Sequence, residues 1–285
     1  MKHYLSIDIG GTFIKYGIFN ENAQLLLKDK IKTIPDNIVG QVKNLAQEFS
    51  HTHLFKGIGI SSAGIIDRTK GEVIYAGPTI PNYKSTNFKN AFKNKKLKIH
   101  VENDVNAALL GEIWKGRAKD IDKVFCMTLG TGIGGAFYDI GKPFDGANLQ
   151  ANSIGYLLYD EQTKTTYEQR ASTKALEQQI TFKLSNIENA EELFQEAKNG
   201  NKDCMDVIEN WAKEVAEGIA QIILIIDPRL ILIGGGISEQ GNFLIKHIQK
   251  YIHHFLPQDF YKTKINTTKL KNDAALFGAV YHFFN

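Results

Sequence analysis

Two glycine-rich turns are the first residues whose types and spacing suggest chemistry. DIGGT covers residues 8–12, and LGTGIGG covers residues 129–135. Glycine leaves backbone N–H groups open to a phosphate, and a threonine hydroxyl adds a neutral donor. Neither turn has the G-x-x-x-x-G-K-[ST] pattern of a P-loop, and a strand pattern rather than a helix follows each one. Each turn alone could be an ordinary hairpin, but the pair favours a phosphate site built from two parts of the chain.

The segment VENDVNAALLGE, residues 101–112, offers a carboxylate that could act as a base. Asn103 or Asp104 precedes an apolar-periodic stretch, which is the usual place for a helix N-cap. The segment also follows a buried strand pattern, and α/β sheets bind ligands at the carboxyl ends of strands. The two roles are compatible, because Asn103 can cap the helix while Asp104 meets a substrate. We predict that Asp104 acts as a general base toward a substrate bound at this point.

Alternating strand and helix patterns must position these groups, and they predict an α/β layer architecture in two halves. Strand patterns cover residues 4–9, 13–19, 24–31, 55–61, 96–104, 124–130, 134–140 and 229–235. Helical spacing covers residues 38–49, 105–116, 205–226, 241–256 and 273–284. We expect a smaller N-terminal α/β domain over 1–113 and a larger one over 114–271. The C-terminal helix, 272–285, is expected to pack back on the first domain.

The composition excludes several classes of protein. Of the 285 residues, 43% are apolar and 23% are charged, and the net charge of +3 is dispersed, which argues against a nucleic-acid surface. The longest apolar stretch, 218–237, is interrupted by residues 227–229, so we expect no membrane span. The N-terminus does not resemble a signal peptide. Cys126 and Cys204 form no disulfide or metal-binding pattern, so we expect a cytoplasmic location.

The DIGGT turn, the END segment, the GTGIGG turn and a late IGGG turn at 233–236 resemble the sugar-kinase/Hsp70/actin ATPase superfamily. Their order resembles the ROK kinases, and so do GISSAGIID (59–67), GANLQANSIGYLL (146–158) and DAALFGA (273–279). AGPTIPNYKSTNF and YEQRAST look like the zinc-less N-acetylmannosamine kinases of Gram-positive bacteria. The resemblance implies the two-domain actin-like ATPase fold, with nucleotide and sugar bound in a cleft between the domains.

The resemblance also implies ATP and Mg²⁺ as cofactors and assigns their contacts. Asp8 would hold Mg²⁺ through water. The nucleotide would be bound by small residues in the three glycine turns: Gly10, Gly11, Thr12, Thr131, Gly132, Gly235 and Gly236.

The sugar contacts implied by the resemblance are Gly64, Thr79, Asn103, Asp104, Ser153, Tyr156 and Glu168. Many ROK proteins have Glu-x-Gly-His where this chain has Ser153 and Tyr156. Serine cannot accept two hydrogen bonds as a carboxylate does, whereas the tyrosine could donate its phenol or stack on a pyranose ring. The segment that follows, DEQTKTTYEQRAS (160–172), contains no cysteine, and the histidines do not supply a replacement set, so we predict no structural zinc.

These observations lead to a kinase that phosphorylates the 6-hydroxyl of N-acetylmannosamine with ATP. A glucokinase or β-glucoside kinase of the same family is the alternative. A sugar-responsive regulator is least favoured, because such relatives carry an N-terminal helix-turn-helix and here the first strand pattern begins near residue 4. We expect a homodimer that binds sugar and ATP but neither nucleic acid nor membrane.

Overall fold

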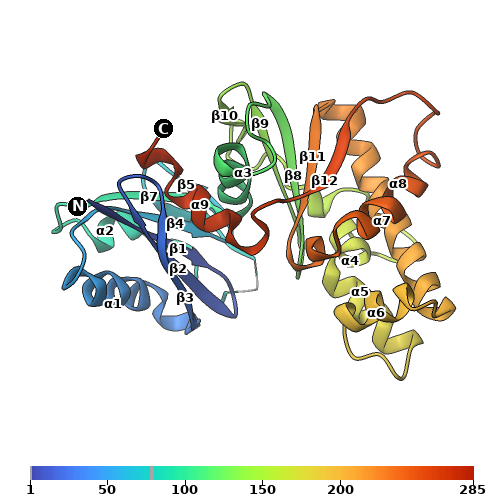
Figure 1. Ribbon diagram of the computed structural model, residues 1–285, viewed down its shortest axis with the longest axis horizontal. Helices are drawn as coiled ribbons and strands as arrows, with labels where there is room; N and C mark the ends of the chain where they lie inside the picture. The colour runs from blue at the N-terminus through green and yellow to red at the C-terminus, as the bar shows by residue number, and fades with distance from the viewer. Residues whose placement is uncertain (1, 78–79) are drawn as a thin grey trace. The chain divides into compact units, whose positions relative to one another are not determined.

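The computed structural model describes residues 2–77 and 80–285, and these residues form two compact units (Figure 1). The first unit contains the described residues up to Lys119 together with 145–150 and 273–285. The second unit contains 120–144 and 151–272. Each unit has its own hydrophobic core.

The first unit extends beyond residue 113 because the end of its last long helix is tied to the residues that follow. The N–H groups of Gly116 and Ala118 both donate to the Glu112 carbonyl at 3.1 Å. The N–H of Arg117 donates to the buried Glu112 carboxylate at 2.7 Å. Through these bonds, Glu112 fixes the chain to the end of this helix as far as Ala118.

A five-stranded sheet in the order β3-β2-β1-β4-β7 forms the centre of the first unit. The strands are β1 (His3–Ile9), β2 (Phe13–Asn20), β3 (Leu25–Lys32), β4 (Phe55–Ser62) and β7 (Lys98–Asn103). β1 is antiparallel to β2 and parallel to β4, and β4 is parallel to β7. The carboxyl ends of β1, β4 and β7 therefore meet, with Asp8 beside Ser61 and Ser61 beside Glu102 in the register. Ligands bind at this end of an α/β sheet.

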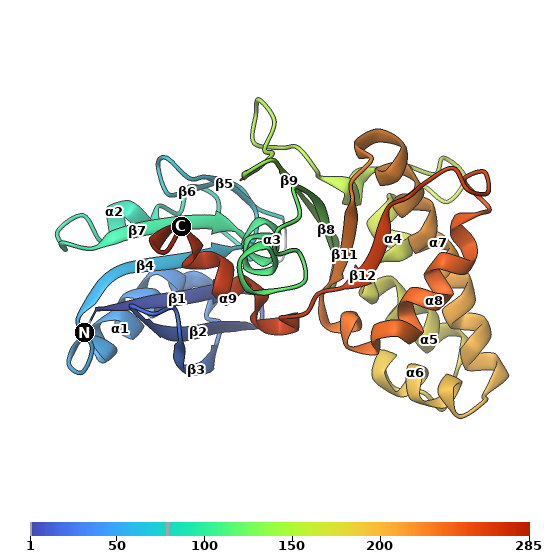
Figure 2. The same cartoon turned by 45° about the horizontal axis from the view of Figure 1, so that its top comes forward.

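Helices cover both faces of this sheet. On one face, α1 (Ile38–Ser50) packs with the apolar side chains of β1 and β4. On the other, α3 (Asp104–Lys115) and α9 (Ala274–Ala279) lie side by side (Figure 2), and Ser6 Oγ donates to the Leu276 carbonyl at 2.6 Å. A Cβ at Gly278 would lie only 1.6 Å from the Ala107 carbonyl oxygen, so glycine allows the two helix backbones to touch. The unit also contains β5 (Ile65–Asp67), β6 (Glu72–Tyr75) and α2 (Phe88–Ala91).

The second unit has a five-stranded sheet in the order β10-β9-β8-β11-β12. Its strands are β8 (Lys123–Leu129), β9 (Ile133–Asp139), β10 (Lys142–Pro143), β11 (Leu230–Gly234) and β12 (Lys264–Thr267). Its helices are α4 (Tyr167–Ala171), α5 (Thr173–Lys183), α6 (Ala190–Lys198), α7 (Lys202–Ile226) and α8 (Gly241–Ile252). The side chain of Trp211, on α7, is fully buried in the core, and its Nε1 donates to the Ala171 carbonyl at 3.0 Å.

The two hairpins around the glycine turns are confirmed by the antiparallel pairing of β1 with β2 and of β8 with β9. The prediction of a continuous helix over 273–284 is wrong beyond Ala279, where the chain turns and forms a 3-10 turn at Tyr281–Phe283. The reason is packing on the sheet, since a Cβ at Gly59 would lie 2.0 Å from the Ala279 oxygen and Phe283 stacks on Tyr4. This tertiary packing overrides the apolar periodicity of the segment.

None of the helices in the described ranges combines the length and the apolar character needed to cross a bilayer.

Candidate functional site

Asp8 lies at the end of β1, where two side chains contact its carboxylate. Ser61 Oγ donates to Asp8 Oδ1 at 2.7 Å, and Lys15 Nζ lies 3.7 Å from Asp8 Oδ2. Burial raises the pKa of Asp8, while Lys15 and Ser61 oppose that shift. The Asp8 side chain is 15% exposed, so this carboxylate is largely removed from water and still accessible to a ligand.

The turn after Asp8 is fixed from the neighbouring chain segment. Thr33 Oγ1 donates to the Gly10 carbonyl at 2.7 Å, and the Thr33 N–H donates to the Thr12 carbonyl at 3.0 Å. The N–H groups of Gly11 and Thr12 have no hydrogen-bond partner within the described residues. Thr33 thus fixes the carbonyls of Gly10 and Thr12, and the N–H groups of Gly11 and Thr12 are left to donate to an anion.

Asn103 caps the N-terminus of α3, whose first residue is Asp104, and the Asn103 side chain also bonds to the Gly64 turn. Asn103 Oδ1 accepts from the N–H groups of Val105 and Asn106 at 3.0 and 3.1 Å. Asn103 Nδ2 donates to the Gly64 carbonyl at 2.8 Å and to Asp104 Oδ1 at 2.9 Å. Asn103 therefore connects the helix terminus, the Gly64 turn and the predicted base.

Asp104 has the electrostatics of a group that can exchange a proton near neutrality. Burial and the nearby charge of Asp8 raise the pKa of Asp104 to about 7, although hydrogen bonds from the Val105 N–H and Asn103 oppose the rise. A carboxylate whose pKa is close to the working pH is well matched to general-base catalysis. Perturbed carboxyl groups of this kind occur preferentially at functional sites.

Gly64 lies in the turn between β4 and β5, where φ is +99° and a Cβ would lie 2.4 Å from the Tyr75 oxygen. The neighbouring Ser62 Oγ shares a 2.7 Å hydrogen bond with the hydroxyl of buried Tyr83. Thr79, another predicted sugar contact, lies outside the described residues.

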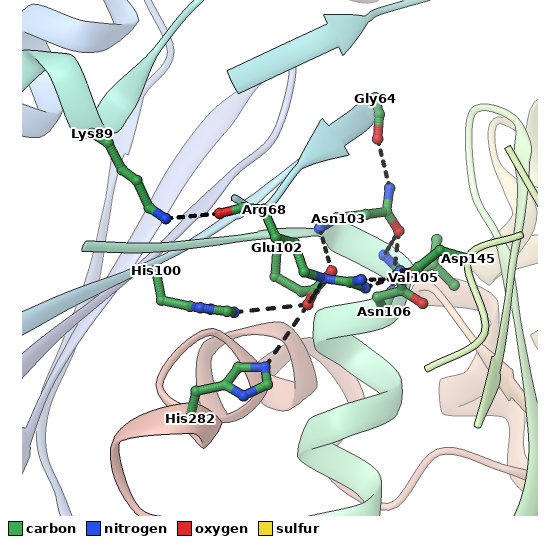
Figure 3. Close-up of polar contacts among 10 residues, drawn as sticks. All are labelled: Gly64, Arg68, Lys89, His100, Glu102, Asn103, Val105, Asn106, Asp145 and His282. Carbon is green, nitrogen blue, oxygen red and sulfur yellow. Dashed lines mark hydrogen bonds and ion pairs between the residues drawn. The ribbon is translucent and has the colours of Figure 1, made fainter. Parts of the chain in front are cut away.

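A network around Arg68 was not predicted from the sequence (Figure 3). Arg68 Nε donates to Glu102 Oε2 at 2.6 Å, Nη2 donates to Asp145 Oδ1 at 2.9 Å, and Nη1 contacts Asp145 Oδ2. Asn106 Nδ2 also donates to Asp145 Oδ1 at 3.3 Å. The network holds segment 145–150 against the strand and helix that carry Asn103 and Asp104.

Glu102 is only 1% exposed, and yet its pKa is lowered rather than raised. Burial would raise the pKa of Glu102, but His100 and Arg68 outweigh that effect and lower it. Glu102 Oε1 accepts the N–H of Asn103 at 2.9 Å, so the buried charge acts on the backbone next to Asp104. The only sequence signal was the position of Glu102 beside the helix cap.

In the second unit, the turn between β8 and β9 is held by the start of α5. Thr173 Oγ1 donates to the Leu129 carbonyl at 3.1 Å, and the Lys174 N–H donates to the Gly130 carbonyl at 3.2 Å. Thr131 is exposed at the tip of the turn. Within the described part of the chain, the N–H groups of Thr131 and Gly132 have no partner.

Glu168 lies directly against this turn rather than on an open surface. Its Oε2 accepts the Ile133 N–H at 3.2 Å. A Cβ at Gly132 would lie 2.6 Å from Oε2, and a Cβ at Gly155 would lie 2.8 Å from the same atom. The two glycines therefore make room for the carboxylate, which joins the GTGIGG turn to the segment that contains Ser153 and Tyr156.

Ser153 is the N-cap of a 3-10 turn, Ile154–Tyr156, and the Tyr156 N–H donates to the Ser153 carbonyl at 3.3 Å. Both residues are exposed, and the tyrosine side chain is 60% exposed. The turn places them beside Gly155 and hence near Glu168.

The IGGG turn comes close to the same hairpin. Gly235 has a φ of +89°, and a Cβ there would lie 2.1 Å from the Leu129 carbonyl oxygen. Apart from its chain neighbours, no described residue has a heavy atom within 4 Å of the Cβ position of Gly236. The turn thus packs against the end of β8 on one side and stays open on the other.

Comparison with known proteins identifies the family of this chain. The sequence pattern of the ROK family matches residues 4–284. A β-glucoside kinase of Listeria innocua is 30% identical over 295 residues, which cover 98% of this chain and 96% of the relative. A ROK family glucokinase of Streptomyces griseus, solved with glucose and AMPPNP, has a TM-score of 0.85 and 26% identity over 97% of each chain.

A Listeria monocytogenes protein described as a candidate N-acetylmannosamine kinase has a TM-score of 0.86 and 28% identity, covering 99% of this chain and 98% of that one. These matches cover both halves of the chain. The chain therefore belongs to the ROK family and has the two-domain fold of the actin-like ATPases.

Proposed function

We propose that this protein is a kinase that transfers the terminal phosphoryl group of ATP to the 6-hydroxyl of N-acetylmannosamine, with Asp104 as the general base. One observation carries the proposal. Asp104 begins α3 at the carboxyl end of a sheet, its Oδ1 is held by Asn103 and the Val105 N–H, and its pKa of about 7 suits proton transfer.

Each unit offers groups of the kind that bind a magnesium nucleotide. Carboxylate oxygens are preferred ligands for Mg²⁺, and Asp8 would hold the ion through water. The unpartnered N–H groups of Gly11, Thr12, Thr131 and Gly132 would bind phosphate oxygens, and the open side of the Gly235–Gly236 turn would face the nucleotide. When bound, Mg²⁺ neutralises negative charge on the phosphates.

The protein's own residues would then act on the sugar. Asp104 orients the attacking hydroxyl and takes its proton as the phosphoryl group moves. Asn103 fixes the Asp104 carboxylate through its amide, and the turn N–H groups stabilise charge on the transferring group. Gly64, Thr79, Ser153, Tyr156 and Glu168 are proposed to bind the sugar.

The choice of N-acetylmannosamine rests on the sequence resemblance and on the similarity to the Listeria monocytogenes protein. A glucokinase or β-glucoside kinase is the second candidate, because a β-glucoside kinase is 30% identical over nearly the whole chain.

We also propose that the zinc position of other family members is lost here. The homodimer and the cytoplasmic location stay predictions. The molar mass measured by light scattering as the protein elutes from a size-exclusion column tests the dimer.

A panel of sugars in a coupled assay of ADP release tests the substrate. N-Acetylmannosamine should give the highest kcat/KM, whereas much faster turnover of glucose or a β-glucoside would favour the second candidate. Asp104→Asn should lower kcat by about 10²–10⁴ while ATP still binds. Near-normal turnover by this variant would refute the role of Asp104 for every sugar in the panel.

A further inference from the structure

His100, Glu102 and His282 form a cluster that the proposed kinase reaction does not use. Their candidate ligand atoms all lie within 4.8 Å of one another, and the metal-ligand geometry singles out this group within the described residues. His100 and Glu102 are on β7, whereas His282 lies in the 3-10 turn near the C-terminus. In Figure 3 both imidazole rings point toward the same edge of the Glu102 carboxylate.

The contacts within the cluster are too long for hydrogen bonds. His100 Nε2 lies 3.8 Å from Glu102 Oε2, and His282 Nε2 lies 4.0 Å from the same oxygen. His100 Nε2 is buried and has no hydrogen-bond partner among the described residues. A buried polar atom without a partner calls for an explanation, and an ion between the three groups would provide one.

The remaining bonds of Glu102 are those expected of a metal-binding carboxylate. Oε1 accepts the Asn103 N–H, and Oε2 accepts Arg68 Nε, which is itself held by Asp145. Hydrogen bonds of this kind orient metal ligands and are part of most metal sites. Because a carboxylate oxygen has two lone pairs, Oε2 can keep Arg68 and still bind an ion.

We propose that His100 Nε2, Glu102 Oε2 and His282 Nε2 bind a divalent cation of the zinc class, with water as the fourth ligand. Two imidazoles and one carboxylate are a usual donor set for Zn²⁺, at metal–ligand distances of about 2.0–2.2 Å. Such distances require the three atoms to move closer together. The His282 side chain is 37% exposed on a short turn, so it gives both the freedom to move and a path for the ion.

The ion would join the C-terminal turn to the strand that leads into Asn103 and Asp104. This site differs from the zinc position of other family members, because it lies in the first unit and uses no residue of the 153–168 region. The proposal departs from our prediction that the histidines supply no zinc-binding set and that the protein has no structural zinc. The sequence could not indicate it, since His282 is far from His100 along the chain.

The test is zinc binding by the full chain after treatment with a chelator. Calorimetric titration with ZnCl₂ should show one ion per chain, and zinc should raise the thermal unfolding temperature. His282→Gln should weaken binding by at least about tenfold and remove the zinc-dependent rise in unfolding temperature. His100→Gln should do the same, and circular dichroism confirms that both variants fold.

His247→Gln is the matched control. His247 Nδ1 lies 2.7 Å from Glu209 Oε1 in another, partly buried histidine–glutamate pair, but this pair does not belong to the three-ligand group. The control should bind zinc as the wild type does. The proposal is overturned if the wild type binds no zinc at millimolar concentration, or if His282→Gln binds as tightly as the wild type.

Discussion

At the scale of single residues, Asp104 illustrates how a side chain can both belong to a helix terminus and carry chemistry. The position would stabilise an ionised carboxylate through the helix dipole. Burial and Asp8 have the opposite effect and dominate, so the pKa of Asp104 rises to about 7. Burial of this charge lowers the free energy of unfolding, and in return Asp104 is a base that is partly protonated near neutral pH.

The pH profile should report this balance. The base must be unprotonated, so kcat/KM should fall by about tenfold per pH unit as the pH drops below about 7. Initial rates at saturating ATP and low sugar concentration between pH 5 and 9 measure the profile. A flat profile down to pH 5 would contradict the raised pKa.

The same shift predicts a stability effect. The pKa of Asp104 is higher in the folded than in the unfolded state, so its burial destabilises the fold above pH 7 and ceases to do so as the pH falls toward 4. Asp104→Asn should therefore unfold at a higher temperature than the wild type at pH 8. The difference in unfolding temperature between the variant and the wild type should disappear as the pH falls toward 4.

At the scale of elements, the Asn103 side chain caps α3 and also bonds the helix terminus to the Gly64 turn. Asn103→Ala should cost about 0.5–2 kcal/mol in unfolding free energy for the lost cap and should also lower kcat, because Asp104 loses its amide partner. Urea unfolding and steady-state kinetics measure the two effects.

Asn189→Ala is the matched control, since Asn189 caps α6 by accepting from the Glu192 N–H at 3.0 Å. It should lose comparable stability while kcat stays unchanged. Equal loss of activity in both variants would mean that general destabilisation, and not the position of Asp104, explains the effect of Asn103.

Arg68 joins three elements through ion pairs that are mostly removed from water. Arg68→Ala leaves the buried charge of Glu102 without its partner, so it should cost about 3–5 kcal/mol in urea unfolding. Arg229→Ala, which removes a pair with Asp122 at 70% and 48% exposure, should cost less than about 1 kcal/mol. Equal costs would show that the Arg68 network is no more than a surface contact.

At the scale of the whole molecule, the two units have separate cores, and each carries a single tryptophan. Trp114 lies on α3 in the first unit, and Trp211 lies in the core of the second. The tryptophans can therefore report on the two units separately.

Fluorescence of Trp114→Phe and of Trp211→Phe during urea unfolding therefore reports one unit each. We expect Asp104→Asn at pH 8 to raise the midpoint seen through Trp114 and to leave the midpoint seen through Trp211 unchanged. A shared shift in both signals would show that the units unfold as one.

The sequence by itself determined the local features of this protein. The glycine turns, their flanking hairpins and the Asn103 cap follow from short-range rules, because glycine conformation, strand alternation and capping depend on neighbouring residues. The family resemblance likewise rested on short motifs, and the match over residues 4–284 confirms it.

The tertiary structure decided everything that depends on distant residues meeting. The raised pKa of Asp104, the Arg68 network with Asp145 and the position of Glu168 against Gly132 all arise from burial and packing between segments far apart in the chain. Packing on the sheet also ended α9 early and brought His282 to His100. No local pattern encodes these contacts, because their energy appears only when the elements pack together.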